Sequence, residues 1–302
     1  MNGASETQPG TKPARENAEV LRSAEVERAL RGGHPVVALE STILCHGLPF
    51  PANLETHRAA EEAVRREGAV PALVSVVDGV PRAGFSPAEV ESLARAGRSV
   101  RKATMAIASA AGIRVFATGG IGGVHRGVAQ TFDVSADLLE LSRTRVAVVA
   151  SGAKAVLDLP KTLEALETLG VPVLGFGTSE FPAFWIRGSG LPLEVCCDDA
   201  REVARVVLAH WSWPGAGGVL VANPVPMEAA LAKEDVDEAI ERSLAAAQAA
   251  GVTGKAVTPY LLARLAEETG GRTLAANRAL VVSNAAVAAR IAVALVPGST
   301  RR

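Results

Sequence analysis

The chain has 302 residues, of which 48% are hydrophobic and only 4% aromatic. Its 31 basic and 32 acidic residues leave a formal net charge of −1, so there is no overall positive field to hold a nucleic acid or an anionic membrane. The length and the composition, rich in Val, Leu and Ala, favour one large α/β domain at residues 17–302 after a disordered N-terminal tail at residues 1–16. The sequence therefore predicts a small-molecule substrate rather than a nucleic acid or a membrane.

Cysteine usage and hydropathy predict the compartment. Three cysteines, two of them adjacent, imply no disulfide framework, which suits a reducing environment. The N-terminal tail lacks the apolar core of a signal peptide. The Ala- and Val-rich stretch at residues 275–296 contains Arg278 and Arg290, so it is not expected to cross a bilayer. The sequence therefore predicts a cytoplasmic protein without a membrane partner.

Short Val-, Ile- and Ala-rich runs alternate with helical stretches, which is typical of strands buried on both faces of a largely parallel sheet. Asn53 is expected to cap a helix that ends at Gly68, and Pro160 to open a helix that Gly170 closes. The pattern predicts a single three-layer α/β/α domain with a helical C-terminal third, which covers one flank of the sheet or forms a subunit interface. The expected strands are residues 35–40, 70–77, 113–118, 145–151, 171–175 and 219–223, and the C-terminal helices are residues 236–250, 259–269 and 274–296.

Polar residues directly after the predicted strands are the candidates for chemistry, because ligands of open α/β sheets bind beyond the carboxyl ends of the strands. Glu40 follows the first strand, where a partly desolvated carboxyl group can hold and give up a proton near neutral pH. Lys154 follows the most continuous apolar strand, where loss of hydration favours a neutral amine that attacks an aldehydic carbon. The alternatives are that Glu40 only caps a turn and Lys154 only extends to solvent.

Residues 118–127 read TGGIGGVHRG and follow another predicted strand. Glycines let backbone amides approach an anion closely, and His125 or Arg126 can add charge-assisted bonds to a phosphate. The spacing does not match the dinucleotide-binding fingerprint, and a tight turn is the alternative interpretation.

Two acids, Asp133 and Asp137, lie four residues apart with Ser135 between them. If a helix begins there, both carboxylates share one face and can hold a divalent cation through oxygen ligands and water. The alternative is that Asp133 caps the following helix while Asp137 stabilises its first turn.

Taken together, these segments resemble the signatures of the pseudouridine-5′-phosphate glycosidase family, in the family's order and from about Pro35 nearly to the C-terminus. The resemblance implies an α/β/α enzyme, usually a homotrimer, that reversibly cleaves the carbon-carbon bond between uracil and ribose 5-phosphate. The segments that carry it are ALESTI (38–43), HGLPFP (46–51), FATGGIGGVHRG (116–127), TFD and SAD (131–133 and 135–137), SGAK (151–154), VANP (221–224) and TPYLL (258–262).

The same resemblance implies catalytic roles for two residues. Lys154 is the expected nucleophile, which attacks C1′ of the opened ribose and forms a Schiff base. Glu40 is the expected proton donor to C5 of the base, because a base joined to the sugar through carbon cannot leave by simple protonation of an oxygen.

The resemblance also implies binding residues and a cofactor. Asp133 is expected to bind one Mn²⁺-type cation per subunit. The residues expected to contact the nucleotide substrate are Lys102, His125, Ser135, Ala136 and Asp137.

The sequence departs from the family's pattern directly after Lys102. There the family continues with a segment containing SRRDLP and then GATTVA, whereas here Ala103-Thr104-Met105 follows at once. The absence of this segment, part of which lines the site in relatives, motivates a second hypothesis: a catalytically silent protein that binds a sugar phosphate or acts in assembly. A third hypothesis is another Schiff-base enzyme of sugar phosphates, such as an aldolase-like catalyst, which Lys154 and Glu40 alone would permit.

Overall fold

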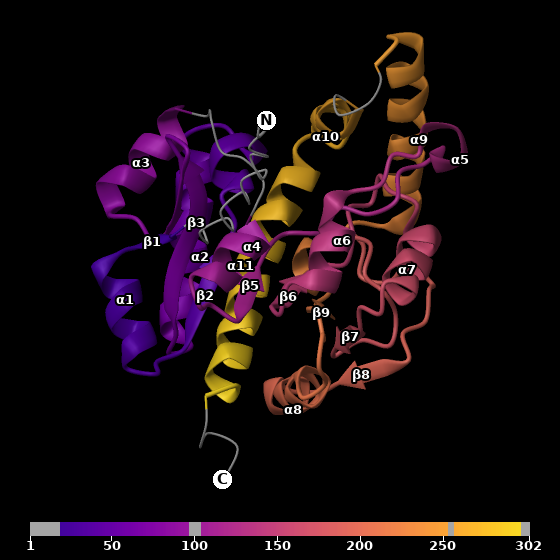
Figure 1. Cartoon of the computed structure of the whole chain (residues 1–302). Helices are drawn as coiled ribbons and strands as arrows, with labels where there is room; N and C mark the ends of the chain where they lie inside the picture. Colours follow the sequence, from indigo (N-terminus) through magenta and orange to yellow (C-terminus); the bar gives the residue numbers. More distant parts are fainter. Residues whose placement is uncertain (1–18, 97–103, 253–256, 297–302) are drawn as a thin grey trace, which may run out of the picture.

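The computed structural model describes residues 19–96, 104–252 and 257–296 (Figure 1). Lys102 and the expected tail at residues 1–16 lie outside these ranges. In chain order the elements are β1 (Leu21–Arg22), α1 (Ala24–Arg31), β2 (Val36–Leu39), the π-helical turn η1 (Ile43–Gly47), α2 (Ala52–Arg66), β3 (Val70–Val77), β4 (Val80–Ala83), α3 (Pro87–Ala96), α4 (Thr104–Ala110), β5 (Val115–Ala117), α5 (Val128–Thr131), α6 (Ala136–Arg143), β6 (Ala147–Ala150), α7 (Leu159–Thr168), β7 (Val173–Phe176), β8 (Val195–Cys197), α8 (Ala200–Trp211), β9 (Val219–Ala222), the 3-10 turn η2 (Met227–Ala229), α9 (Lys233–Ala249), α10 (Val257–Glu268) and α11 (Arg272–Ala294).

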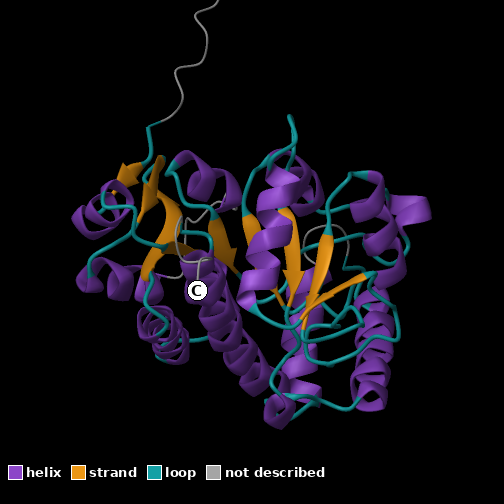
Figure 2. Cartoon of the chain, turned by 90° about the horizontal axis from the view of Figure 1, so that it is seen from below, coloured by secondary structure: helices purple, strands orange, loops and turns teal. Residues whose placement is uncertain are grey.

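The strands of the described residues form one nine-stranded sheet in the order β1-β4-β3-β2-β5-β6-β9-β7-β8. From β3 to β8 all neighbouring pairs are parallel, and within the described sheet the one antiparallel pair is β3 with β4. Helices surround the sheet (Figure 2). The predicted α/β fold with a largely parallel central sheet is confirmed.

All six predicted strands are present, as β2, β3, β5, β6, β7 and β9, and three further strands were not predicted. Among these, β4 returns from β3 through Asp78 and Gly79, whose φ angles are 50° and 80°. An Asp-Gly pair with both φ angles positive is the preferred two-residue turn of a β-hairpin, so the sequence did carry this signal. The other two, β1 and β8, have two and three residues, too few to show an alternating pattern.

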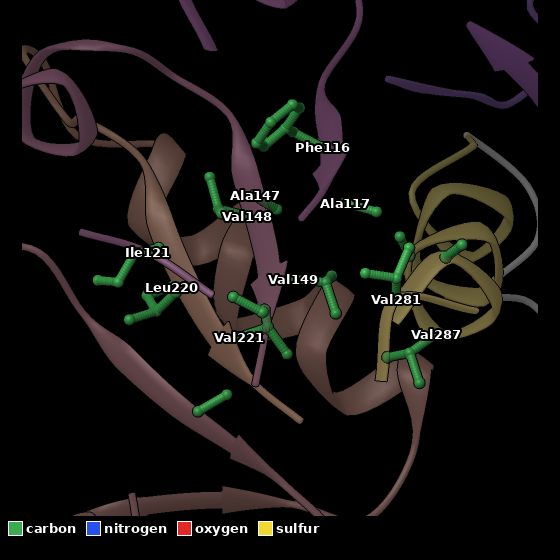
Figure 3. Close-up of a cluster of buried hydrophobic side chains, with 14 of the residues drawn as sticks. Phe116, Ala117, Ile121, Ala147, Val148, Val149, Leu220, Val221, Val281 and Val287 are labelled. Carbon is green, nitrogen blue, oxygen red and sulfur yellow. The ribbon is translucent and has the colours of Figure 1, made fainter. Parts of the chain in front are cut away.

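The C-terminal helix α11 lies against the middle of the sheet. It contacts β2, β5 and β6 as well as α2 and α8, and it crosses the centre of the molecule (Figure 1). Val281 and Val287 extend from α11 toward Ala117 and Val149, and all four are buried (Figure 3). Burial of each valine contributes about 1.5–3 kcal/mol. The predicted helical C-terminal third is therefore confirmed, and within it α11 covers the sheet and is part of the main core.

Asn53 does not cap α2, so that prediction was wrong. The helix begins at Ala52 after Pro51, and the buried Asn53 side chain lies inside its first turn. Its Nδ2 donates to the carbonyl oxygens of Leu44 at 2.6 Å and Ala94 at 2.9 Å. Asn53 thereby ties α2 to η1 and to the end of α3, which fixes the segment that follows Glu40.

No helix within the described ranges is long and apolar enough to span a bilayer.

Candidate active site

Polar residues follow four neighbouring parallel strands, β2, β5, β6 and β9. These residues are Glu40, Thr118, Ser151 and Asn223. Because parallel strands present their carboxyl ends at one edge, the four residues share that edge. One strand separates β2 from β6, which sets the two about 10 Å apart. The fold thus brings Glu40 to the same edge of the sheet as the segment that carries Lys154.

The carboxylate of Glu40 is held by the residues that follow β5. Its Oε1 accepts a hydrogen bond from Thr118 Oγ1 at 2.7 Å and another from the Gly119 amide at 3.1 Å. Thr118 is buried and Glu40 is half-buried. The arrangement gives a carboxylate with one oxygen anchored from the neighbouring strand.

Lys154 is half-buried at the end of a tightly packed turn after β6. Gly152 has a φ of 68°, and a Cβ atom added there would lie 1.9 Å from the Pro182 carbonyl oxygen. The Gly152 carbonyl accepts from the Ile121 amide at 3.0 Å, and the Lys154 amide donates to the Ile121 carbonyl at 3.2 Å. The backbone of Lys154 is thereby fixed to the Gly-rich segment after β5.

A buried carboxamide on α11 joins the ends of β5, β6 and β9. Asn284 is fully buried, and its Nδ2 lies 2.8 Å from the Thr118 carbonyl oxygen, 3.2 Å from that of Gly119 and 3.2 Å from Ser151 Oγ. Its Oδ1 accepts from Asn223 Nδ2 at 2.8 Å. The sequence reasoning missed Asn284, although a single asparagine in a run of Ala and Val is the signal of a buried polar contact.

The Gly-rich segment packs against the start of α6. The Gly122 amide donates to Asp137 Oδ2 at 2.8 Å, and Ser135 Oγ caps α6 by accepting from the Asp137 amide. A Cβ atom on Gly122 would lie 2.2 Å from Ser135 Oγ, so only glycine fits. Ala136 is the first residue of α6 and is exposed.

Asp133 and Asp137 do not share a helix face, so that expectation was wrong. The helix α6 begins at Ala136, and Asp133 lies before it in an extended segment where Val134 bridges Val124. The cap is Ser135, so the alternative of Asp133 as the cap was also wrong.

His125 lies beside Asp133. Its Nδ1 is 3.8 Å from Asp133 Oδ2, and its amide donates to the Asp133 carbonyl oxygen at 3.0 Å. The Asp133 side chain is 40% exposed. Within the described residues, no group of three or more His, Cys, Asp or Glu side chains gathers to hold a metal ion. Of this pair, the Asp133 carboxylate is the group that could hold a hydrated cation of the Mg²⁺ type, which is bound by one or two carboxylates and keeps several waters.

A cavity of about 330 Å³ lies next to the Lys154 turn. Arg126 and Ala155 are among the residues that line it, together with Lys233 and Asp237 of α9. A second hollow of about 840 Å³ lies elsewhere, between α2 and the first half of α11. Neither set of lining residues includes Glu40 or Lys154.

Cys45 lies close in sequence to Glu40, within η1. Burial raises the pKa of its thiol to about 11, so it is protonated at neutral pH. The thiol is therefore a poor nucleophile at neutral pH.

Comparisons with known proteins follow the same segments. The family model described as "Indigoidine synthase A like protein" matches residues 25–104 and 102–294. A protein of Sorangium cellulosum named pseudouridine-5′-phosphate glycosidase is 52% identical over 294 residues, covering 90% of this chain and 92% of that protein. One of Escherichia coli with the same name is 47% identical over 291 residues, covering 89% and 93%.

Solved structures agree with the fold. The prealnumycin C-glycosynthase AlnA, crystallised with ribulose 5-phosphate, aligns with a TM-score of 0.85 at 37% identity and covers 95% of this chain and all of that one. An indigoidine synthase A-like protein of Thermotoga maritima aligns with a TM-score of 0.82 at 35% identity, covering 93% and 98%.

The matches also indicate residues that this chain lacks. The family model matches in two stretches that meet at residues 102–104. The 294 aligned positions with the first relative exceed 90% of a 302-residue chain, so some of those positions are gaps here. Both findings agree with the segment expected to be missing after Lys102.

We predict that Gly152→Ala destabilises the protein more than Gly170→Ala. Both residues have φ near 67°, which costs an alanine about 1–2 kcal/mol, but space is open around Gly170. At Gly152 the clash with the Pro182 carbonyl adds about 1–3 kcal/mol. Urea unfolding of the two variants measures the difference, and equal losses would contradict the packing described here.

We also predict that Asn284→Ala lowers the free energy of unfolding by about 2–4 kcal/mol, because it leaves several buried partners without a hydrogen bond. Ser283→Ala is the matched control, since Ser283 Oγ accepts one bond from Asn223 at the edge of the same network. We expect the control to lose about 1 kcal/mol or less in the same measurement. If Asn284→Ala loses no more free energy of unfolding than the control, the network does not stabilise the fold as proposed.

Proposed function

This chain belongs to the pseudouridine-5′-phosphate glycosidase family, and on that premise we propose that it reversibly cleaves pseudouridine 5′-phosphate to uracil and ribose 5-phosphate. The names of the relatives at 52% and 47% identity support the substrate. The observation that carries the proposal is the anchored Glu40 carboxylate at the sheet edge from which the Lys154 turn extends.

In the proposed reaction the Lys154 amine bonds to C1′ as the bond from C1′ to the ring oxygen O4′ breaks, and the proton that the amine loses goes to O4′, which becomes a hydroxyl of the opened ribose. The nitrogen lone pair then forms the C1′=N bond while the bond from C1′ to C5 breaks, and its electron pair leaves with the base. Glu40 supplies the proton that C5 receives. Water hydrolyses the iminium, which returns the lysine and releases ribose 5-phosphate.

Substrate contacts are proposed for the segment around α6. Ser135, Ala136 and Asp137 lie beside the Gly-rich segment, whose backbone suits an anionic ligand. His125 adds charge-assisted binding when it is protonated. Lys102 is proposed to contact the substrate as well, on the family resemblance alone.

A divalent cation of the Mn²⁺ type is proposed at Asp133. One oxygen of Asp137 already accepts the Gly122 amide, whereas the Asp133 side chain is 40% exposed beside His125. Asp133 is therefore the better direct ligand. Such an ion, when bound, supplies positive charge to anionic oxygens of the substrate.

The assembly proposed from the family resemblance is a cytoplasmic homotrimer. Sedimentation equilibrium of the full chain measures its mass directly. A monomer or dimer across the micromolar range would reject this part of the proposal.

A catalytically silent protein that binds a sugar phosphate or acts in assembly is the second candidate. The observation that favours it is the match of the family model in two stretches that meet at residues 102–104. Measurable release of uracil from pseudouridine 5′-phosphate eliminates this candidate. Absence of release from folded protein, with manganese present, would favour it over the enzyme.

We predict that Lys154→Ala abolishes trapping of ribose 5-phosphate by borohydride and lowers uracil release by about 10³-fold or more, because the nucleophile is lost. Lys161→Ala is the control, since Lys161 is 58% exposed and pairs with Asp158 in the adjoining helix. Mass mapping of the trapped protein locates the adduct. An adduct on another lysine, or its absence in folded wild-type protein, contradicts the assignment.

A further prediction concerns the cation. Asp133→Asn is expected to raise the concentration of manganese needed for half-maximal uracil release by about tenfold or more, because a neutral amide is a weaker ligand for a hard cation than a carboxylate. Asp78→Asn is the control, since this exposed residue lies in the β3–β4 turn, where asparagine tolerates positive φ. Titration of EDTA-treated protein measures both. Equal manganese dependence in the two variants would place the ion elsewhere.

A further inference from the structure

We infer that Thr118 is a positioning residue for the proton donor and that Glu40 carries its transferable proton on Oε2. The inference rests on the proposed function, because it concerns the proton that the departing base receives. It adds the atom that gives the proton and the residue that orients it.

The two oxygens of the Glu40 carboxylate differ in their hydrogen bonds. A backbone amide only donates, so the bond from the Gly119 amide at 3.1 Å makes Oε1 an acceptor. The Thr118 hydroxyl, 2.7 Å away, approaches the same oxygen. Both bonds that this carboxylate makes with described residues therefore go to Oε1. A proton placed on Oε1 would compete with two donors, whereas a proton on Oε2 leaves both bonds intact.

The two donors are themselves held in place. The Thr118 amide donates to the Val149 carbonyl of β6 at 3.0 Å, and the carbonyls of Thr118 and Gly119 both accept from Asn284. A glutamate side chain otherwise rotates about three bonds, and fixing Oε1 removes most of that freedom. The plane of the carboxyl group, and with it the direction in which Oε2 presents its proton, is set from β5.

Thr118 acts on the proton transfer and not on formation of the lysine adduct. Condensation of ribose 5-phosphate with an amine requires no proton at C5 of a base. Loss of the Thr118 hydroxyl should therefore slow uracil release while adduct formation persists. A residue that only stabilised the fold would lower both together.

The test compares Thr118→Val, which keeps the shape but removes the hydroxyl, with Thr118→Ser, which keeps the hydroxyl. We expect Thr118→Val to lower kcat for uracil release at least about tenfold with KM changed less than about twofold, because one of two donors to Oε1 is lost. Borohydride trapping of ribose 5-phosphate is expected to stay near the wild-type level. Thr118→Ser is expected to recover most of kcat.

Three outcomes overturn the inference in an active wild-type background: an unchanged kcat in Thr118→Val, a parallel loss of trapping and release in the folded variant, or a serine variant as slow as the valine variant. If Thr118→Val does not fold, Thr118→Ala compared with Thr118→Ser decides by the same criteria. Wild-type protein that neither traps ribose 5-phosphate nor releases uracil overturns the proposed function itself, and this inference with it. Trapping therefore distinguishes the two failures.

Discussion

The side chain of Asn284 joins α11, the last helix of the described residues, to the ends of β5, β6 and β9. Its amide group donates to the carbonyls after β5 and its oxygen accepts from Asn223 after β9, and the Asn284 side chain itself is fully buried. Burying a carboxamide is unfavourable unless its groups are paired, and here the pairing partners are the backbone atoms that shape the candidate site. The apolar packing of α11 and the geometry of the site thus depend on one another. A shift of α11 would leave the strand-end carbonyls without their donor, and a shift of the strand ends would leave the buried Asn284 side chain unpaired.

The parallel half of the sheet was predictable because strands buried on both faces must be continuously apolar, as Val219–Ala222 and Ala147–Ala150 are. The antiparallel part of the sheet was harder to predict. The strand β4 contains Pro81 and lies largely outside the deep core, so its pattern is weak, and the Asp78-Gly79 turn was its one clear signal. Position on the sheet, and not composition alone, decides which strands a sequence reveals.

The candidate site, too, was only partly predictable from the sequence. Glu40 and Lys154 were found from their places directly after apolar runs, and the family resemblance gave them roles that stay proposals. Sequence spacing failed for Asp133 and Asp137, because α6 begins at Ala136 where Ser135 supplies the cap. The bond between Thr118 and Glu40 joins residues 78 positions apart, so only the register of β2 beside β5 brings them together. Local sequence patterns can indicate candidate residues, but they do not predict which distant residues those candidates contact.

The position of α11 at residues 272–294 has a consequence for biosynthesis. A ribosome completes the sheet strands and the lysine turn well before it makes Asn284, so the nascent chain carries strand ends whose buried carbonyls still have no helix to cover them. Those groups stay hydrated until α11 packs against the sheet. The residues at these strand ends thus acquire their fixed geometry only after α11 has been made, and a product truncated before Asn284 lacks the hydrogen bonds that hold them.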